Sequence, residues 1–193
     1  KEEPDPEVIL GNINVIVLGN MTTNRFIYKL YCQWYTLLDT KYPGKGGYVV
    51  RSLHDPYGTG KNVIEIGGSE NTGVLKASER FCALLPSGKS MIVGRLMDIK
   101  LGEGLVPPKI EKDGTGLKDI STWIGNAWAS KGTDSGSGWN PISLSGILYY
   151  MTGNQEYIDC FKNLVKPDPD NIPAAVREFY SFVNLKRPLV DQV

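Results

Sequence analysis

The chain has 193 residues with 21 basic and 21 acidic side chains, so its formal net charge is zero, and 41% of it is hydrophobic. This composition is typical of a globular protein, and the lack of a basic excess argues against nucleic acid as the main partner. Every apolar run is shorter than the roughly 20 residues of a membrane span, which excludes a membrane-spanning helix by sequence.

The first ten residues are a charged leader that contains two prolines and no methionine. Such a leader is typical of a tether left after an export signal has been removed, or of a chain cut at an arbitrary point. The first interpretation predicts an extracytoplasmic protein, which is periplasmic, secreted or held at the cell surface.

Residues 11–101 alternate between strand and helix patterns. The run 13–18 is almost continuously apolar, which favours a central strand. Thr22 or Thr23 can cap the following helix, and Ser69 or Asn71 can cap the second one. The predicted elements are strands at 13–18, 48–53, 63–66 and 91–99, and helices at 23–39 and 71–85.

This order, β-α-β-β-α-β, predicts an α+β sandwich in which two helices lie on a four-stranded sheet. It is the order of the ferredoxin-like or split βαβ arrangement, which places both helices on one face. The turn 55–60 contains Gly58 and Gly60, and Lys61 follows it directly, as in a phosphate-binding loop. However, a strand follows instead of a helix, so we interpret the turn as part of an antiparallel hairpin.

The second half begins with a linker at 102–116 that is rich in glycine and proline, and helical patterns follow it over 117–193. Pro141 suits the start of a helix, Gly153 suits its end, and Asn154 can cap the next helix. This part is therefore predicted to be all-helical, with an αα-hairpin turning at Gly153.

The run 62–74 (Asn-Val-Ile-Glu-Ile-Gly-Gly-Ser-Glu-Asn-Thr-Gly-Val) resembles a segment of a small α/β domain in carbohydrate-active enzymes. That domain precedes the catalytic domain in enzymes of the hexosaminidase and α-glucuronidase kind, and the similarity extends over about residues 13–85. The resemblance implies an accessory domain that carries no catalytic residue.

The run 148–157 (Leu-Tyr-Tyr-Met-Thr-Gly-Asn-Gln-Glu-Tyr) is similar to a helical hairpin of α/α-toroid glycosidases and polysaccharide lyases. This similarity covers about residues 141–165. Together the two resemblances imply the N-terminal part of a larger polysaccharide-degrading enzyme, whose downstream catalytic domain would be a partner in the same chain.

Aromatic side chains gather in the second half, and their faces can stack on the C–H surfaces of sugars. Trp123 and Trp128 have helical spacing and are predicted to belong to a core. Trp139 instead lies in a run of glycine and serine, where a ligand or interdomain contact would explain an exposed tryptophan. The candidate glycan-binding residues are Trp139, Asn140, Tyr149 and Tyr150.

No set of residues is singled out as catalytic, and no metal or other cofactor is expected. His54 is the only histidine, and we interpret it as a turn residue because no second ligand or nucleophile motif accompanies it. The acidic residues form no pair with the spacing of a glycosidase site. The three cysteines also lack metal-site spacing, and we expect Cys32 and Cys82 to be buried on helices.

These observations favour a non-catalytic part of an exported carbohydrate-active enzyme, which positions a catalytic domain or contacts glycan. Two alternatives remain at this point. One is a self-standing hydrolase with a site between the two domains, using His54 or acids near Trp139. The other is a purely structural or protein-binding module.

Overall fold

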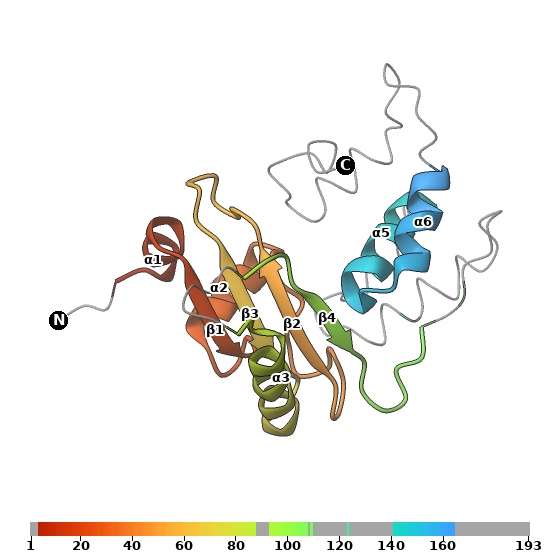
Figure 1. The fold of residues 1–193 in the computed structure, drawn as a ribbon, viewed down its shortest axis with the longest axis horizontal. Coiled ribbons are helices and arrows are strands. Elements are labelled where there is room, and N and C mark those ends of the chain that lie inside the picture. Colours follow the sequence, from red (N-terminus) through yellow and green to blue (C-terminus); the bar gives the residue numbers. More distant parts are fainter. Residues whose placement is uncertain (1–3, 88–92, 108, 110–122, 124–140, 165–193) are drawn as a thin grey trace, which may run out of the picture. The chain divides into compact units, whose positions relative to one another are not determined.

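The computed structural model describes residues 4–87, 93–107, 109, 123 and 141–164. It divides into two compact units, Lys1–Leu105 and Val106–Val193, which are described separately (Figure 1). The division falls inside the segment 102–116 that the sequence marks as a linker. In chain order the elements are α1 (Pro6–Asn12), β1 (Val15–Gly19), α2 (Arg25–Cys32), β2 (Tyr48–Leu53), β3 (Val63–Gly67), α3 (Asn71–Leu84), β4 (Met97–Lys100), α5 (Pro141–Thr152) and α6 (Gln155–Leu164).

The first unit is built on a mixed four-stranded sheet with the strand order β1-β3-β2-β4. β1 runs parallel to β3, while β2 runs antiparallel to both β3 and β4. The predicted α+β class and the predicted hairpin of β2 and β3 are therefore confirmed. Within that class the strand order differs from the ferredoxin-like one, because β4 pairs with β2 rather than with β1.

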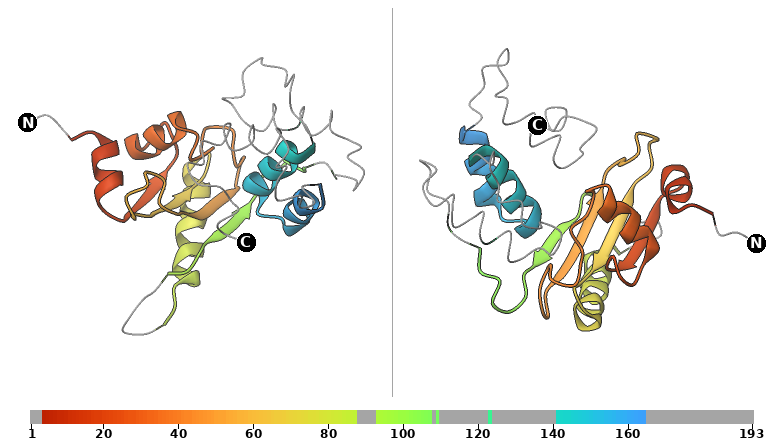
Figure 2. Two further views of the ribbon diagram at one scale, coloured as in Figure 1. Left: turned by 90° about the horizontal axis from the view of Figure 1, so that it is seen from above. Right: turned by 180° about the vertical axis from the view of Figure 1, so that it is seen from behind.

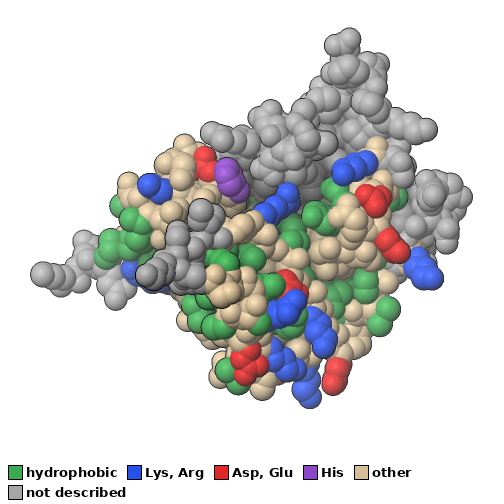
Figure 3. Space-filling view, viewed as in Figure 1, with side chains coloured by type: hydrophobic (Ala, Val, Ile, Leu, Met, Phe, Trp, Pro, Cys, Tyr) green, Lys and Arg blue, Asp and Glu red, His purple; other side chains and the backbone are tan. Residues whose placement is uncertain are grey.

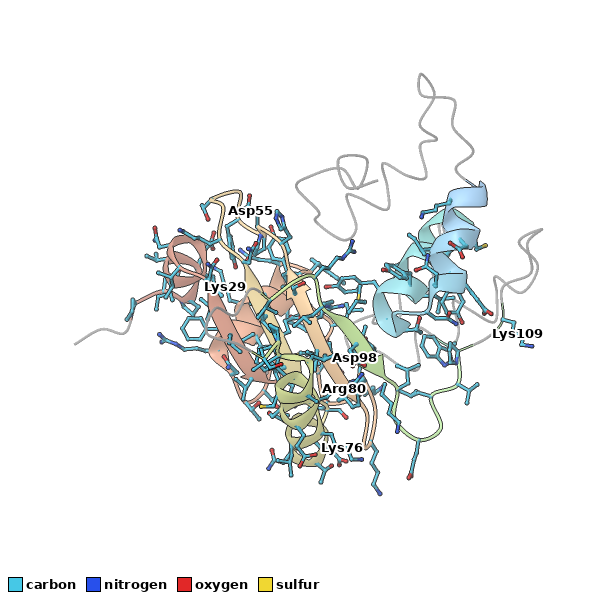
Figure 4. The ribbon with its side chains drawn as sticks, in the orientation of Figure 1. Lys29, Asp55, Lys76, Arg80, Asp98 and Lys109 are labelled. Carbon is cyan, nitrogen blue, oxygen red and sulfur yellow. The ribbon has the colours of Figure 1, made fainter. Side chains whose placement is uncertain are left out.

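The position of β4 follows from the position of α3, which packs chiefly over β2 and β3. The chain that leaves α3 therefore reaches the free edge of β2. There the N–H of Ser52 donates to the carbonyl of Leu96 at 3.0 Å, and the side chains of Arg80 on α3 and Asp98 on β4 form an ion pair (Figure 4). As a result β1 lies at an edge, and the prediction of a central first strand is wrong.

The two helices cover opposite faces of the sheet rather than one face (Figures 1 and 2). Consecutive residues Val49 and Val50 are both fully buried, although successive side chains of a strand point to opposite faces. Val50 and Ile66 pack against Ala77 and Phe81 of α3. The opposite face is covered by α2 and the segment after it, so the middle of β2 is buried on both faces.

α2 is shorter than the predicted helix at 23–39. Asn24 caps its start by accepting from the N–H groups of Phe26 and Ile27. At its end Trp34 adopts a left-handed backbone conformation, with φ 64°. The N–H of Trp34 donates to the carbonyl of Tyr31. The N–H of Tyr35 donates to the carbonyl of Leu30 at 2.9 Å. This pair of bonds is the Schellman motif, here with tryptophan where glycine is usual.

The charged leader becomes a helix earlier than the sequence indicates. Asp5 accepts from the N–H of Glu7, and Pro6 occupies the first turn, so the two residues start α1 together. Leu10 is completely buried, and Glu7 forms an ion pair of 2.8 Å with Lys29 of α2. The leader predicted for residues 1–10 therefore ends before Pro6.

The second unit is described as a hairpin of α5 and α6 that pack against each other. Gly153 has φ 66° between them, as predicted for the residue after a helix. The side chain of Asn154 accepts from the N–H of Glu156 at 3.1 Å and so caps α6. The predicted hairpin is confirmed. Of the helical pattern around residues 120–128 the structure describes only Trp123, which is helical. The pattern around residues 173–183 lies outside the described residues.

The cysteines differ from expectation, because Cys32 and Cys82 are exposed and Cys160 is buried. Burial also raises the pKa of the Cys160 thiol. We therefore expect a maleimide to modify Cys32 and Cys82 in the native chain and Cys160 only after denaturation, as mass spectrometry of peptides would show. A Cys32→Ser/Cys82→Ser variant is the control. Rapid modification of that variant in buffer would contradict the burial of Cys160.

Candidate functional site

Two of the four predicted glycan-binding residues lie near the end of α5. Tyr149 and Tyr150 are both partly buried, while their helix buries Ile147, Leu148 and Met151. Each of the two tyrosines is therefore partly exposed to solvent. Trp139 and Asn140 lie outside the described residues, so the grouping of all four remains a prediction.

The turn after these tyrosines presents polar groups. The hydroxyl of Thr152 donates to the carbonyl of Leu148 and accepts from the N–H of Asn154. On α6 the exposed amide of Gln155 donates to the carboxylate of Asp159 at 3.0 Å. Amides, hydroxyls and carboxylates beside aromatic rings are the groups that bind sugar hydroxyls. This end of the hairpin is therefore the candidate site in the second unit.

His54 and Asp55 belong to the turn between β2 and β3, as predicted. His54 is exposed, and Asp55 accepts from the N–H of Gly60 at 2.7 Å. The backbone N–H of Asp55 donates to the side chain of Asn62 at 3.0 Å. Gly58 and Gly60 both have positive φ, with values of 69° and 76°. Asp55 thus holds the turn together, and the antiparallel strands on either side confirm a hairpin rather than a phosphate-binding loop.

A buried ion pair joins β2 and β3. Arg51 and Glu65 face each other in the register of the two strands, and their side chains are 1% and 0% exposed. Nε and Nη2 of Arg51 both donate to Oε2 of Glu65, at 3.1 and 2.7 Å. The second oxygen of Glu65 is buried and accepts no hydrogen bond. A carboxylate held in this way is a structural group.

Sequence reasoning missed this pair, although a signal was present. Arg51 and Glu65 are charged residues inside apolar strands, and they are equally distant along the chain from Gly58. A hairpin centred on that glycine therefore places them opposite each other. Opposite charges at facing positions indicate a cross-strand pair.

Further polar groups surround the loop that follows α2. Asp39 is 1% exposed and accepts from the hydroxyl of Tyr31 at 2.9 Å and from the N–H groups of Lys41 and Tyr42. Burial raises the pKa of Tyr42, and the carboxylate of Glu65 raises it further, although Arg51 lowers it. The hydrogen bonds of Asp39 join the loop to α2 and stabilise the turn within the loop.

Glu70 lies at the start of α3. Its carboxylate accepts from the hydroxyl of Thr72 at 2.7 Å and from the N–H of Gly46 at 3.0 Å. The hydrogen bond from Thr72, followed by that from Gly46, lowers the pKa of Glu70. The predicted caps Ser69 and Asn71 are not used, because Glu70 itself is the capping residue, although its side chain accepts no capping hydrogen bond from a backbone N–H of the helix. Glu70 therefore links α3 to the loop that precedes β2.

Among the residues that the structure describes, no group of three histidine, cysteine or acidic side chains could hold a metal ion. Within the same residues, no helix has both the length and the apolar character needed to cross a membrane.

Comparisons of the chain with protein-family models, with curated proteins and with solved structures find no match. The contacts described above therefore carry the functional argument, together with the resemblances of the runs 62–74 and 148–157.

Proposed function

We propose that the chain is a non-catalytic part of an exported carbohydrate-active enzyme. In this proposal the α/β unit positions a downstream catalytic domain, and the helical part contacts glycan through Tyr149, Tyr150, Trp139 and Asn140. The parent enzyme would be a glycoside hydrolase or a polysaccharide lyase.

The observation that carries the proposal is the structural role of Glu65 in the motif 62–74. This acid is fully buried and paired with Arg51, so it is not available to a substrate. Glu70, in the same motif, is held by Thr72 and Gly46. The run forms a strand, a glycine turn and a helix, as the resemblance to an accessory domain implies. Both acids therefore support the architecture of the domain.

A second support comes from the end of α5. The partly buried tyrosines are followed in the chain by Asn154 and Gln155, which are exposed and carry amide side chains. A protein that binds glycan without cleaving it needs aromatic surface and hydrogen-bonding groups, and it needs no activated acid.

The experiment is a binding screen of the whole chain against a panel of polysaccharides, read by quenching of tryptophan fluorescence. We expect saturable quenching by at least one polysaccharide, and we expect Trp139→Ala to abolish it. Trp34→Phe, a change in the α/β unit, is the matched control and is expected to leave the binding curve unchanged.

Product analysis in the same samples separates the alternatives. Release of sugar fragments by the chain would contradict the non-catalytic proposal and favour a self-standing hydrolase. Absence of quenching by the entire panel would contradict glycan binding, and the function of the chain would then be structural or protein-binding.

A further inference from the structure

Basic side chains gather on the face of the sheet that α3 covers, at the side of α3 nearer to β4. Lys76 and Arg80 lie one helical turn apart on α3, and Lys100 is the last residue of β4. Lys45 belongs to the loop before β2, and all four residues are exposed. In Figure 3, which views this face, Lys and Arg side chains form a group beside α3. These four residues form a basic cluster.

One half of the basic cluster is organised around Gly46. The ammonium of Lys76 donates to the carbonyl of Gly46 at 3.3 Å, and Lys45 directly precedes that glycine. The N–H of Gly46 and the hydroxyl of Thr72 both donate to Oε1 of Glu70, and after these bonds the charges of Lys45 and Lys76 lower the pKa of Glu70 further. Because both bonds end on Oε1, the other oxygen of this exposed carboxylate can accept from a ligand.

The other half of the basic cluster surrounds Tyr48, which is partly exposed. Lys100 faces Tyr48 in the register of β2 and β4. The hydroxyl of Tyr48 donates to Asp98 at 3.2 Å, and Asp98 also pairs with Arg80 (Figure 4). Unlike Arg80, the three lysines of the cluster make no ion pair within 4 Å in the part of the chain that the structure describes. Their ammonium groups are therefore available to an anion.

This mixture of groups fits the chemistry of an acidic sugar. Ammonium groups bind a carboxylate or a sulfate, a free carboxylate oxygen accepts from sugar hydroxyls, and the ring of a tyrosine packs on sugar C–H groups. Nucleic acid fits less well, because it carries a phosphate on every nucleotide. Glu70 lies within the cluster, and the exposed Glu79 and Glu103 lie beside it in the chain. These carboxylates repel closely spaced phosphates and tolerate a polymer whose charges alternate with hydroxyls.

We propose that the basic cluster binds an acidic polysaccharide, which carries a carboxylate or a sulfate on its repeating sugars. This role rests on the proposed function, because it gives the α/β unit a glycan contact of its own and names the chemical class of the glycan. Lys45, Lys76 and Lys100 bind the anionic groups, while Glu70 accepts from hydroxyls. An exposed ammonium holds a single anion weakly, whereas a polymer that repeats the anion is held at several points at once.

The test titrates the whole chain into fluorescently labelled oligomers of polygalacturonate, dextran sulfate and neutral dextran, with anisotropy as the readout. We expect at least one of the two acidic polymers to bind, with an affinity that falls as the salt concentration rises. The comparison of the two shows whether carboxylate or sulfate is preferred. Neutral dextran is expected to show no salt-dependent binding.

A triple variant places the binding on the basic cluster. Lys45→Gln/Lys76→Gln/Lys100→Gln is expected to weaken binding of the acidic polymer by about tenfold, as the loss of three exposed ion pairs implies. The matched control, Arg25→Gln/Lys29→Gln/Lys61→Gln, removes the same charge from α2 and from the turn between β2 and β3, and it should retain the affinity. Circular dichroism establishes that both variants are folded.

Three outcomes would overturn the inference. The first is a folded lysine variant that binds the acidic polymer as tightly as the wild type. The second is an equal loss in the control variant, which would indicate attraction to charge in general. The third is tighter binding of a DNA oligonucleotide of equal charge. Trp139→Ala keeps this result distinct from the proposed function, because it should lose the quenching of the polysaccharide screen and retain the salt-dependent anisotropy.

Discussion

Replacing Arg51 with methionine is expected to lower the free energy of unfolding by about 3–5 kcal/mol, the range for breaking a buried ion pair from one side. The change removes both hydrogen bonds to Oε2 of Glu65, whose side chain is 0% exposed. Oε1 of the same carboxylate already accepts no hydrogen bond. The variant would therefore contain an uncompensated buried carboxylate. Urea denaturation followed by circular dichroism measures the resulting loss in the free energy of unfolding.

The control is the double variant Arg51→Met/Glu65→Leu. Replacing both partners of a buried pair with apolar residues is often neutral, so we expect this variant to regain most of the lost stability. Arg80→Met removes an arginine from a pair in which Arg80 is 48% exposed, and its effect should be small. If Arg51→Met unfolded at the same urea concentration as the wild type, the pair would have no net structural role.

The buried pair also shows why the strand and the turn of the motif 62–74 could be predicted while the role of Glu65 was missed. Val63, Ile64 and Ile66 indicate a strand by their β-branched side chains, and the two glycines after them indicate a turn. Both features are local in sequence. The role of Glu65 depends on Arg51, which lies on another strand, and becomes visible only once the register of the hairpin is known.

The same distinction separates the elements that were predicted well from those that were not. The bounds of β2 were predicted correctly, because the strand lies between two segments rich in glycine and proline, which is a local signal. α5 was predicted to end before Gly153, because a helix-ending glycine is also a local signal. The end of α2 was missed because Trp34 occupies a position where glycine is usual. Its helical spacing continues the pattern beyond the point at which the backbone turns.

The position of β1 was missed for a different reason. A continuous apolar strand usually indicates burial on both faces, but Ile16 and Leu18 are about half exposed in the single chain. The candidate glycan site is predictable only in part, since Tyr149 and Tyr150 can be placed and Trp139 and Asn140 lie outside the described residues.

The second large effect is expected for Gly73→Ala in α3. Alanine within a helix normally stabilises by about 0.5–1 kcal/mol relative to glycine. Here the new Cβ would collide with the carbonyl oxygen of Gly47 and would lie 3.2 Å from Cα of Gly68. Both contacts are with backbone, which cannot rotate away, so we expect a loss of about 1–3 kcal/mol, the usual cost of overpacking.

Thermal unfolding followed by calorimetry would measure this loss, with Gly94→Ala as the matched control because no atom lies within 4 Å of a Cβ placed there. The sign of the effect decides how α3 is held. A stabilised Gly73→Ala variant would mean that α3 can move away from the loop without cost. A destabilised one would mean that Gly47, Gly68 and Gly73 allow the start of α3 to rest directly on backbone, with Glu70 bonded to Gly46 beside it. In that case the glycines of the motif 62–74 are required by close packing, and their presence in a sequence predicts the contact between helix and loop.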